Sequence, residues 1–218
     1  MTARTPKFIT LEGGEGVGKS TQIRLLVDWL QSSGIGVCQT REPGGSPGAE
    51  HIRDLLVKGD GDRWDPMAEA LLVTAARAEH VARTVKPALK RGDWVVCDRF
   101  SDSTVAYQGA GRGLGVPEMQ ELQALALGGF KPDLTIILDM PVDVGLSRAL
   151  GREEGKTSDM EDRFERLDIS FHKKLRQAFL DIAVAEPERC VVLDAAQSVE
   201  GLHTALRAVI KARFGDVA

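Results

Sequence analysis

The stretch that decides the fold is "LEGGEGVGKSTQIRLL", residues 11–26, in which four glycines and one lysine separate an apolar run from an amphipathic segment. The spacing matches a phosphate-binding loop of the Walker A type, which connects a strand to a helix. Glycines let the backbone N–H groups point at an anion, and the helix N-terminus behind them adds positive charge. We predict that the loop binds a nucleoside triphosphate through Gly13, Gly14, Glu15, Gly16, Val17, Gly18, Lys19, Ser20 and Thr21.

Two of these side chains have chemical roles in such a loop. Lys19 is predicted to reach the β- and γ-phosphates, and the Ser20 hydroxyl is predicted to ligate Mg²⁺. The motif predicts ATP or a related triphosphate, but it occurs in kinases, switch GTPases and motors alike. The sequence has no N-K-x-D segment of the kind that reads guanine, which argues against a GTPase.

Outside the loop, short apolar runs alternate with helical patterns. The runs are residues 7–12, 36–41, 93–98, 133–140 and 189–195. Beside them, apolar residues recur at the i, i+3, i+4, i+7 spacing of amphipathic helices, as in Ile23, Leu26, Val27 and Leu30 and in Val199, Leu202, Leu206 and Val209. Near-continuous apolar strands indicate a parallel sheet that is covered on both faces. We therefore predict an α/β fold of the P-loop NTPase type, with a five-stranded parallel sheet, in a single domain over residues 1–218.

The composition is that of an ordinary globular protein. The net charge of −4, from 28 basic and 32 acidic residues, argues against nucleic acid or an anionic membrane as the main partner. No apolar run is long enough for a membrane span, and the first residues do not resemble a signal peptide, so we expect a cytoplasmic protein. Cys38, Cys97 and Cys190 are interpreted as small apolar residues in or beside strands, not as disulfide or metal ligands.

A second, anionic substrate is suggested by charged residues that follow the strands. Ligands of parallel sheets bind at the carboxyl ends of the strands, and Glu12, Arg41, Asp98 and Asp139 all lie there. Arg41 and Arg99 follow two different strands and are predicted to hold a monophosphate between them. Asp98 could ligate the metal, act as a base or orient Arg99, and these alternatives stay open.

The segment from residue 147 to 166 is charged and interrupted by glycines. It is either a solvated loop or a mobile lid, and we predict a lid at about residues 149–162. Arg152 would then close over the transferring phosphoryl group and stabilise its charge, while the closed lid excludes water. Arg148, Lys156 and Arg163 could assist Arg152 or simply be solvated.

Taken together, these stretches resemble the thymidylate kinase family. The matching segments are "FITLEGGEGVGKSTQ", "TREPGG", "AAR", "DRFSDSTVAYQGAGRGL", "PDLTIILD" and "DRFE", which run from residue 8 to about residue 166. The resemblance implies transfer of the γ-phosphoryl group of ATP to dTMP, with Mg²⁺, in a homodimer of the nucleoside monophosphate kinase fold. Alternatives are a kinase of this fold for another nucleotide or a nucleoside, and a nucleotide-regulated binding module without kinase activity.

The resemblance also assigns roles to the acceptor site. It implies that Glu15 contacts the deoxyribose 3′-hydroxyl, that Arg41 and Arg99 bind the dTMP phosphate, and that Tyr107 packs where a ribose 2′-hydroxyl would sit. It places Arg77 at the thymine edge and Thr104 and Gln108 beside the base.

Two features distinguish this chain within the family. The phosphate loop contains no arginine, so the chain resembles the bacterial form whose catalytic arginine, here Arg152, lies in the lid. Val73 stands one turn before Arg77, where the family commonly has a phenylalanine that stacks on thymine. Replacing that ring removes roughly 1 kcal/mol of stacking beyond simple contact area, for which Leu72 could compensate.

Overall fold

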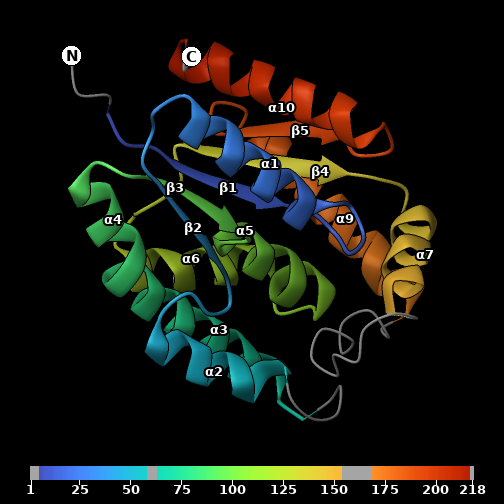
Figure 1. Ribbon diagram of the computed structural model, residues 1–218. Helices are drawn as coiled ribbons and strands as arrows, with labels where there is room; N and C mark the ends of the chain where they lie inside the picture. Colours follow the sequence, from blue (N-terminus) through green and yellow to red (C-terminus); the bar gives the residue numbers. More distant parts are fainter. Residues whose placement is uncertain (1–4, 58–62, 154–167, 217–218) are drawn as a thin grey trace.

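The structure, a computed structural model, describes residues 5–57, 63–153 and 168–216, and its five strands form one parallel sheet in the order β2-β3-β1-β4-β5 (Figure 1). Each strand lies within one residue, at either end, of a run predicted from the sequence. The predicted five-stranded parallel sheet is therefore confirmed. The strands are β1 (Phe8–Glu12), β2 (Val37–Arg41), β3 (Trp94–Asp98), β4 (Leu134–Asp139) and β5 (Cys190–Asp194).

Helices connect consecutive strands, as the alternating pattern predicts. A helical stretch runs from Pro66 to Arg91, but a π-helical turn, η1, interrupts it, and a second one, η2, continues α5. The bounds are α1 (Lys19–Ser32), α2 (Pro47–Val57), α3 (Pro66–His80), η1 (Val81–Val85), α4 (Lys86–Arg91), α5 (Ser101–Thr104), η2 (Val105–Gly111), α6 (Val116–Leu127), α7 (Val142–Glu153), α9 (Ile169–Ala185) and α10 (Val199–Phe214).

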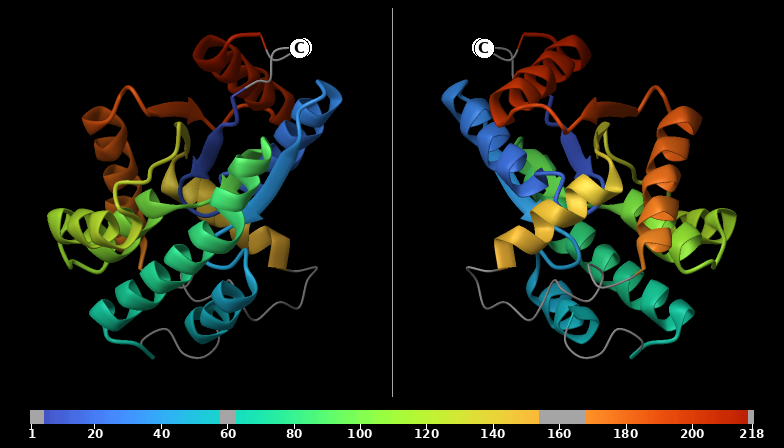
Figure 2. Two further views of the ribbon diagram at one scale, coloured as in Figure 1. Left: turned by 90° about the vertical axis from the view of Figure 1, so that its left-hand side faces the viewer. Right: turned by 90° about the vertical axis from the view of Figure 1, so that its right-hand side faces the viewer.

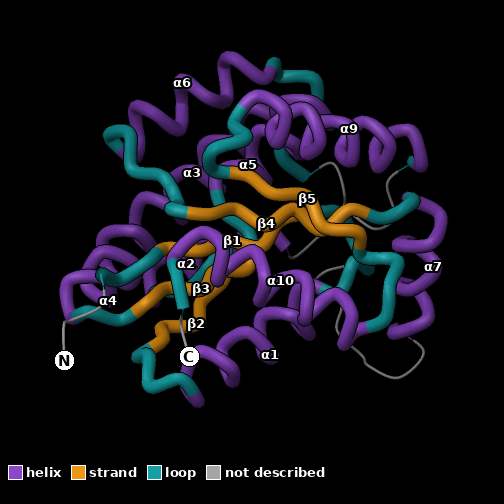
Figure 3. The backbone as a smooth tube through the Cα atoms, turned by 90° about the horizontal axis from the view of Figure 1, so that it is seen from above, coloured by secondary structure: helices purple, strands orange, loops and turns teal. Residues whose placement is uncertain are grey.

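Helices cover both faces of the sheet because successive strand residues point to opposite sides. Ile9 and Leu11 of β1 pack into one core with residues of α1 and α10. Phe8, which points the other way, packs with residues of η1 and α4. A further core beneath β4 and β5 joins α9 to η2. In Figure 3, α1 and α10 lie on one side of the strands and α6 and α9 on the other.

The outer helices extend the molecule away from the sheet. α2 and α3 pack against each other and form a layer at the opposite end of the molecule from α10 (Figures 1 and 2). α3 also contacts α5, η2 and α6. This arrangement places the inner side of α3 across from the segment that follows β3.

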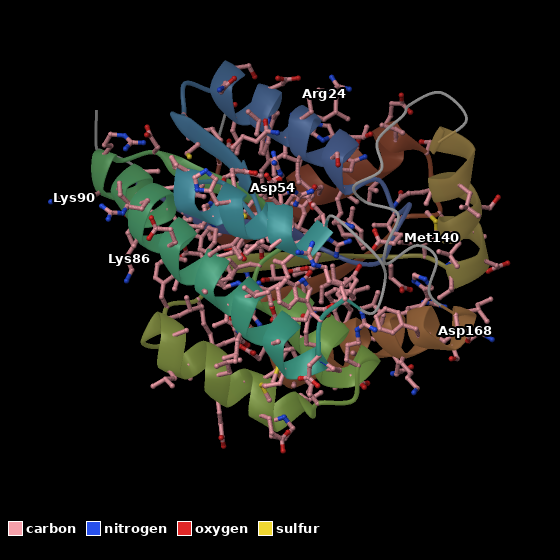
Figure 4. All side chains as sticks on the ribbon, turned by 90° about the horizontal axis from the view of Figure 1, so that it is seen from below. Arg24, Asp54, Lys86, Lys90, Met140 and Asp168 are labelled. Carbon is pink, nitrogen blue, oxygen red and sulfur yellow. The ribbon has the colours of Figure 1, made fainter. Side chains whose placement is uncertain are left out.

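The parallel sheet brings the carboxyl ends of the strands to one edge. Asp98 lies opposite Arg41 of β2 and Leu11 of β1 in the strand register. Met140, which follows β4, and Asp168, which precedes α9, lie at this same end of the molecule, far from Lys86 and Lys90 of α4 (Figure 4). The charged residues predicted at the ends of β1, β2 and β3 therefore share one edge of the sheet.

The remaining bulk predictions concern the cysteines and membrane helices. All three cysteines have free thiols; Cys97 and Cys190 are buried and Cys38 is half-buried, which fits their interpretation as small apolar residues. None of the helices in residues 5–57, 63–153 and 168–216 has the length and hydropathy of a membrane span.

Candidate active site

The phosphate loop needs glycine at two positions for steric reasons. Gly13 has a φ of 132° and Gly16 a φ of 70°, both in the region that disfavours other residues. A Cβ atom on Gly13 would lie 2.4 Å from the Leu138 carbonyl oxygen, and one on Gly16 would lie 1.9 Å from the Gly145 carbonyl oxygen. The loop is thus packed tightly between the end of β4 and the first turns of α7.

Lys19 closes the loop from the inside. Its Nζ donates to the carbonyl oxygens of Gly13, at 3.1 Å, and Gly14, at 2.8 Å. Burial lowers the pKa of Lys19, and the nearby charge of Arg99 lowers it further, while Glu15 acts in the opposite direction. The first backbone bond of α1 runs from the Gln22 amide to the Gly18 oxygen, so the preceding amides remain at the helix N-terminus, where they favour an anion.

Ser20 and Asp98 form a pair of oxygen donors next to the loop. The Ser20 hydroxyl lies 3.4 Å from Asp98 Oδ2. The other carboxylate oxygen, Oδ1, is buried and has no hydrogen-bond partner among the described residues. A buried carboxylate oxygen of this kind, beside a hydroxyl, fits the ligand preference of Mg²⁺, which takes few protein ligands and completes its shell with water and phosphate.

Arg99 connects the end of β3 to the phosphate loop. Its Nη1 donates to the Gly13 oxygen at 3.0 Å, and its Nη2 contacts both carboxylate oxygens of Glu15, at 3.1 and 3.0 Å. The Tyr107 hydroxyl donates to the same carboxylate, and the guanidinium lies 5.0 Å from the Tyr107 ring centre. The structure thus brings three residues assigned to the acceptor site together against the donor loop.

The electrostatics of this group favour a charged carboxylate. Burial acts to raise the pKa of Glu15, but Arg99, Lys19 and the Tyr107 hydrogen bond outweigh it, so the pKa lies below its ordinary value. The ionised Glu15 in turn helps to keep Arg99 protonated, and the pKa of Arg99 is raised well above its ordinary value despite burial.

Arg41 lies at the neighbouring strand end but in a more open setting. Its guanidinium pairs with Glu50 of α2 at 3.0 Å, and its side chain is 53% exposed. Arg41 and Arg99 therefore follow adjacent strands, but their guanidinium groups form ion pairs with different carboxylates, those of Glu50 and Glu15. Sequence reasoning did not single out Arg53, one turn after Glu50, whose Nη1 donates to the Pro43 oxygen at 2.8 Å and so reaches the same turn.

Arg77 is buried in a polar network instead of lying on a surface. Its Nε donates to Glu42 at 2.6 Å and one Nη2–H to the Phe100 oxygen at 2.9 Å, while Nη1 donates to Thr104 at 2.8 Å and to Gln123 at 2.7 Å. Thr104, predicted to lie beside the base, is thus in direct contact with Arg77.

Gln108 lies about one helical turn beyond Thr104 and is also buried. Its Nε2 donates to Glu69 at 2.9 Å. Val73 lies between Glu69 and Arg77 on α3 and is half-buried, as is Leu72. The structure therefore gathers Val73, Arg77, Thr104 and Gln108 along the contact between α3 and the segment from α5 to η2.

Comparison with known proteins agrees with this arrangement. A family model described as thymidylate kinase matches residues 11–206. The chain belongs to the thymidylate kinase family. It is 50% identical over 208 residues to thymidylate kinases of Caulobacter vibrioides and of a Bradyrhizobium species, covering 95% of this chain and 97% and 91% of theirs. The crystal structure of thymidylate kinase from Ehrlichia chaffeensis matches with a TM-score of 0.76 and 34% identity, over 94% of this chain and 98% of that one.

Membership of the thymidylate kinase family confirms the resemblance and the P-loop kinase fold. The protein is an enzyme of nucleotide biosynthesis, a kinase that phosphorylates dTMP with a nucleotide as the phosphate donor. The alternatives of a nucleoside kinase and of a binding module without kinase activity are therefore set aside.

The lid prediction falls mostly outside the described residues. α7 continues to Glu153, so residues 149–153 of the predicted lid are helical, and residues 154–162 lie outside the described part of the chain. Arg152 belongs to the last turn of α7, but its side chain is not among those described. Lys156 and Arg163 also lie outside, whereas Arg148 donates to the Ala195 oxygen at 3.3 Å.

No role was predicted for three buried carboxylates of this site, Glu12, Glu42 and Glu69. Glu12 accepts bonds from the Phe100 amide at 2.7 Å and the Ser103 hydroxyl at 2.6 Å, and so supports the turn that carries Arg99. Burial, and secondly the charge of Asp102, raise the pKa of Glu12 to about 7. The position of Glu12 at a strand end was the feature of the sequence that could have indicated its place in the site. Glu42 and Glu69 have no comparable feature, because their partners are distant in the sequence.

Proposed function

We propose that the enzyme transfers the γ-phosphoryl group of ATP to dTMP, giving ADP and dTDP. The observation that carries this proposal is the contact of Arg99 with the phosphate loop, where its Nη1 lies 3.0 Å from the Gly13 oxygen. A phosphate bound to Arg99 would lie beside phosphates bound in the loop. Phosphoryl transfer depends mainly on such positioning and on neutralising charge.

The donor site consists of the phosphate loop and the start of α1. The amides of residues 13–21 and the Lys19 ammonium would hold the ATP phosphates. Ser20 and Asp98 would hold Mg²⁺, a role supported by their 3.4 Å separation and by the unpartnered Asp98 Oδ1. When bound, Mg²⁺ neutralises phosphate charge. Lys19 would turn from the loop carbonyls to the phosphates, which are the stronger acceptors.

The acceptor site faces this loop. Arg99 and Arg41 would bind the dTMP phosphate, and Glu15 the 3′-hydroxyl of the deoxyribose. The Tyr107 ring would pack against the sugar, which is supported by its contact with Glu15 and its burial. Val73, Arg77, Thr104 and Gln108 would surround the base, since they lie on both sides of the contact between α3 and the segment from α5 to η2.

We also propose that Arg152 stabilises the transferring phosphoryl group from a lid at about residues 149–162. Its place in the last turn of α7 supports this role. α7 begins at the phosphate loop, because a Cβ atom on Gly145 would lie 2.7 Å from the Glu15 carbonyl oxygen. Arg152 is about two turns further on, roughly 10 Å along the helix axis, so closure of the lid would bring its guanidinium to a phosphate in the loop.

A homodimer in the cytoplasm, the compartment that supplies ATP, completes the proposal. Leu71 of α3 is 51% exposed and Leu125 of α6 is 84% exposed, and these two helices are in contact. Ala124 and Ala126 beside Leu125 are exposed as well, so α6 exposes three consecutive apolar residues. A second copy would cover Leu71 and Leu125. A monomeric mass in light scattering at micromolar concentration would contradict the dimer.

The reaction is tested by measuring ADP release from ATP and Mg²⁺ with each nucleoside monophosphate and nucleoside in turn. We expect release with dTMP far above every ribonucleotide and nucleoside. Arg99→Ala should lower dTMP-dependent turnover by about a thousand-fold while ATP binding, followed by calorimetry, persists. Arg24→Ala, on the exposed face of α1, is the matched control. Loss of ATP binding alone in Arg99→Ala would contradict the assignment of two sites.

A further inference from the structure

Two facing rows of side chains run along the contact between α3 and the segment from α5 to η2. On α3, Glu69, Val73 and Arg77 follow one another at intervals of four residues and so share a face. On the other segment, Gln108 contacts Glu69 and Thr104 contacts Arg77. Val73 thus lies between two polar contacts, with one buried carboxylate at the far end of the row.

Glu69 is completely buried, and among the described residues it accepts hydrogen bonds from Gln108 and Arg112. Its Oε1 accepts from Gln108 Nε2 at 2.9 Å and from Arg112 Nε at 3.4 Å, and its Oε2 accepts from Arg112 Nη2 at 3.2 Å. The ion pair with Arg112 stabilises the carboxylate in the interior. Both oxygens of an ionised carboxylate only accept hydrogen bonds. The group of the Gln108 side-chain amide that faces Glu69 therefore has to be the NH₂ group, which donates.

That contact determines which end of the Gln108 amide is presented on the other side. With NH₂ bound to Glu69, the carbonyl oxygen Oε1 is the group left to face a ligand. We propose that Glu69 is a positioning residue for base specificity: by holding the Gln108 amide in this orientation, it selects a pyrimidine that carries an N3–H. This inference rests on the proposed function, in which Gln108 lies beside the base of dTMP.

The other end of the row is complementary. The bonds of Arg77 use its Nε–H, both Nη1–H groups and one Nη2–H, which leaves one Nη2–H without a partner among the described residues. An acceptor on Gln108 and a donor on Arg77 match the adjacent N3–H and O4 of thymine or uracil. Cytosine presents the reverse pattern, an acceptor at N3 and a donor at N4. A site with fixed polar groups discriminates strongly against a base whose pattern leaves them unpaired.

The test compares kcat/KM for dTMP, dUMP and dCMP at saturating ATP in Glu69→Gln. One carboxylate oxygen of residue 69 is then replaced by an NH₂ donor, so the Gln108 amide is no longer held in one orientation. We expect the dTMP:dCMP ratio to fall by roughly ten-fold or more. The dTMP:dUMP ratio should stay unchanged, because both bases carry N3–H. Calorimetric binding of dTMP and dCMP without ATP should show the same change in ratio.

Arg112→Gln is the matched control, because it removes the ion pair with Glu69 and keeps the carboxylate that Gln108 contacts. The dTMP:dCMP ratio of Arg112→Gln should remain that of the unaltered enzyme. Should Glu69→Gln not fold, judged by circular dichroism, Glu69→Asp draws the carboxylate back from Gln108 and should lower the ratio by a few-fold. An unchanged ratio in the folded variant overturns the inference. Inactivity of the unaltered enzyme with dTMP would instead overturn the proposed function.

Discussion

Tyr107 illustrates how one side chain serves two purposes at the acceptor site. Its hydroxyl donates to Glu15, and its ring packs between the Arg99 guanidinium and Phe171 of α9, whose ring centre is 6.1 Å away. The hydroxyl therefore orients the group proposed to bind the 3′-hydroxyl, while the ring is the group proposed to exclude a 2′-hydroxyl. The two purposes can be separated by substitution.

Tyr107→Ala should raise the activity on UMP relative to dTMP by about ten-fold, because removing the ring leaves room for the ribose 2′-hydroxyl. Tyr107→Phe keeps the ring and loses the bond to Glu15, so its UMP:dTMP ratio should match that of the unaltered enzyme. Steady-state kinetics with both nucleotides measure this. An unchanged UMP:dTMP activity ratio in Tyr107→Ala would count against the exclusion of ribonucleotides by the ring.

Glu12 makes a prediction about pH. Its pKa is raised from 4.5 to about 7, so between these values the folded state binds a proton that the unfolded state does not. The free energy of unfolding should therefore fall as the pH rises from 4.5 to 7, by on the order of 2 kcal/mol from this residue.

Glu12→Gln mimics the protonated form, since its oxygen accepts from the Phe100 amide and its NH₂ donates to Ser103. Urea unfolding of both proteins at several pH values measures the effect. The difference in unfolding free energy between Glu12→Gln and the unaltered enzyme should grow in favour of Glu12→Gln as the pH rises from 4.5 to 7. Parallel pH profiles would show that Glu12 is not the titrating group.

At the scale of elements, α7 links the phosphate loop to the predicted lid. Gly145 in its first turns packs against Glu15 and Gly16 with no space for a Cβ atom, so the loop and α7 are in direct contact. At its other end α7 reaches Glu153. The helix thus sets the distance between the phosphate loop and the backbone of Arg152.

Arg152→Ala should lower kcat by about a hundred- to a thousand-fold, with only a modest loss of ATP affinity, because the arginine acts on charge that develops in the transition state. Arg148→Ala, one turn earlier on α7, serves as the comparison, since Arg148 is held by the Ala195 oxygen. We expect its kcat to change much less. Unchanged turnover in Arg152→Ala would refute the role of the lid arginine.

At the scale of the whole molecule, a buried ion pair joins elements that are far apart in the sequence. Asp102 of α5 binds Arg189, just before β5, through two bonds of 2.7 and 2.9 Å. Thr135 of β4 contacts the same carboxylate at 3.3 Å and also bonds to Thr10 of β1 at 2.8 Å. This polar network fastens the segment that follows Arg99 to the strands beneath it.

Asp102→Ala should lower the free energy of unfolding by about 3 kcal/mol or more, because it leaves the Arg189 charge buried with one partner fewer. Asp28→Ala is the control: its 4.0 Å pair with Arg24 is exposed, and its loss should change stability by less than about 0.5 kcal/mol. Denaturant titrations give both values. Equal effects of the two substitutions would contradict the structural importance of the buried pair.

The sequence by itself determined the phosphate loop, the five strands and the family. These depend on short-range patterns: glycine spacing around residues 13–18, apolar runs of strand length, and turns at strand ends that place Glu12, Arg41 and Asp98 on one edge. Periodicity also predicted α1 and α10, because an amphipathic helix carries its own signal in the spacing of its buried residues.

Only the tertiary structure decided the partners of the charged side chains. Arg77 bonds to Glu42 and Gln123, which lie 35 and 46 residues away, and no local pattern encodes such pairs. Arg41 forms an ion pair with Glu50 and does not share a carboxylate with Arg99, since α2 folds back over the turn that follows β2. Hydrogen bonds between distant residues form only after packing has brought the elements together, and this is why the orientation of Gln108 by Glu69 appears in the structure and not in the sequence.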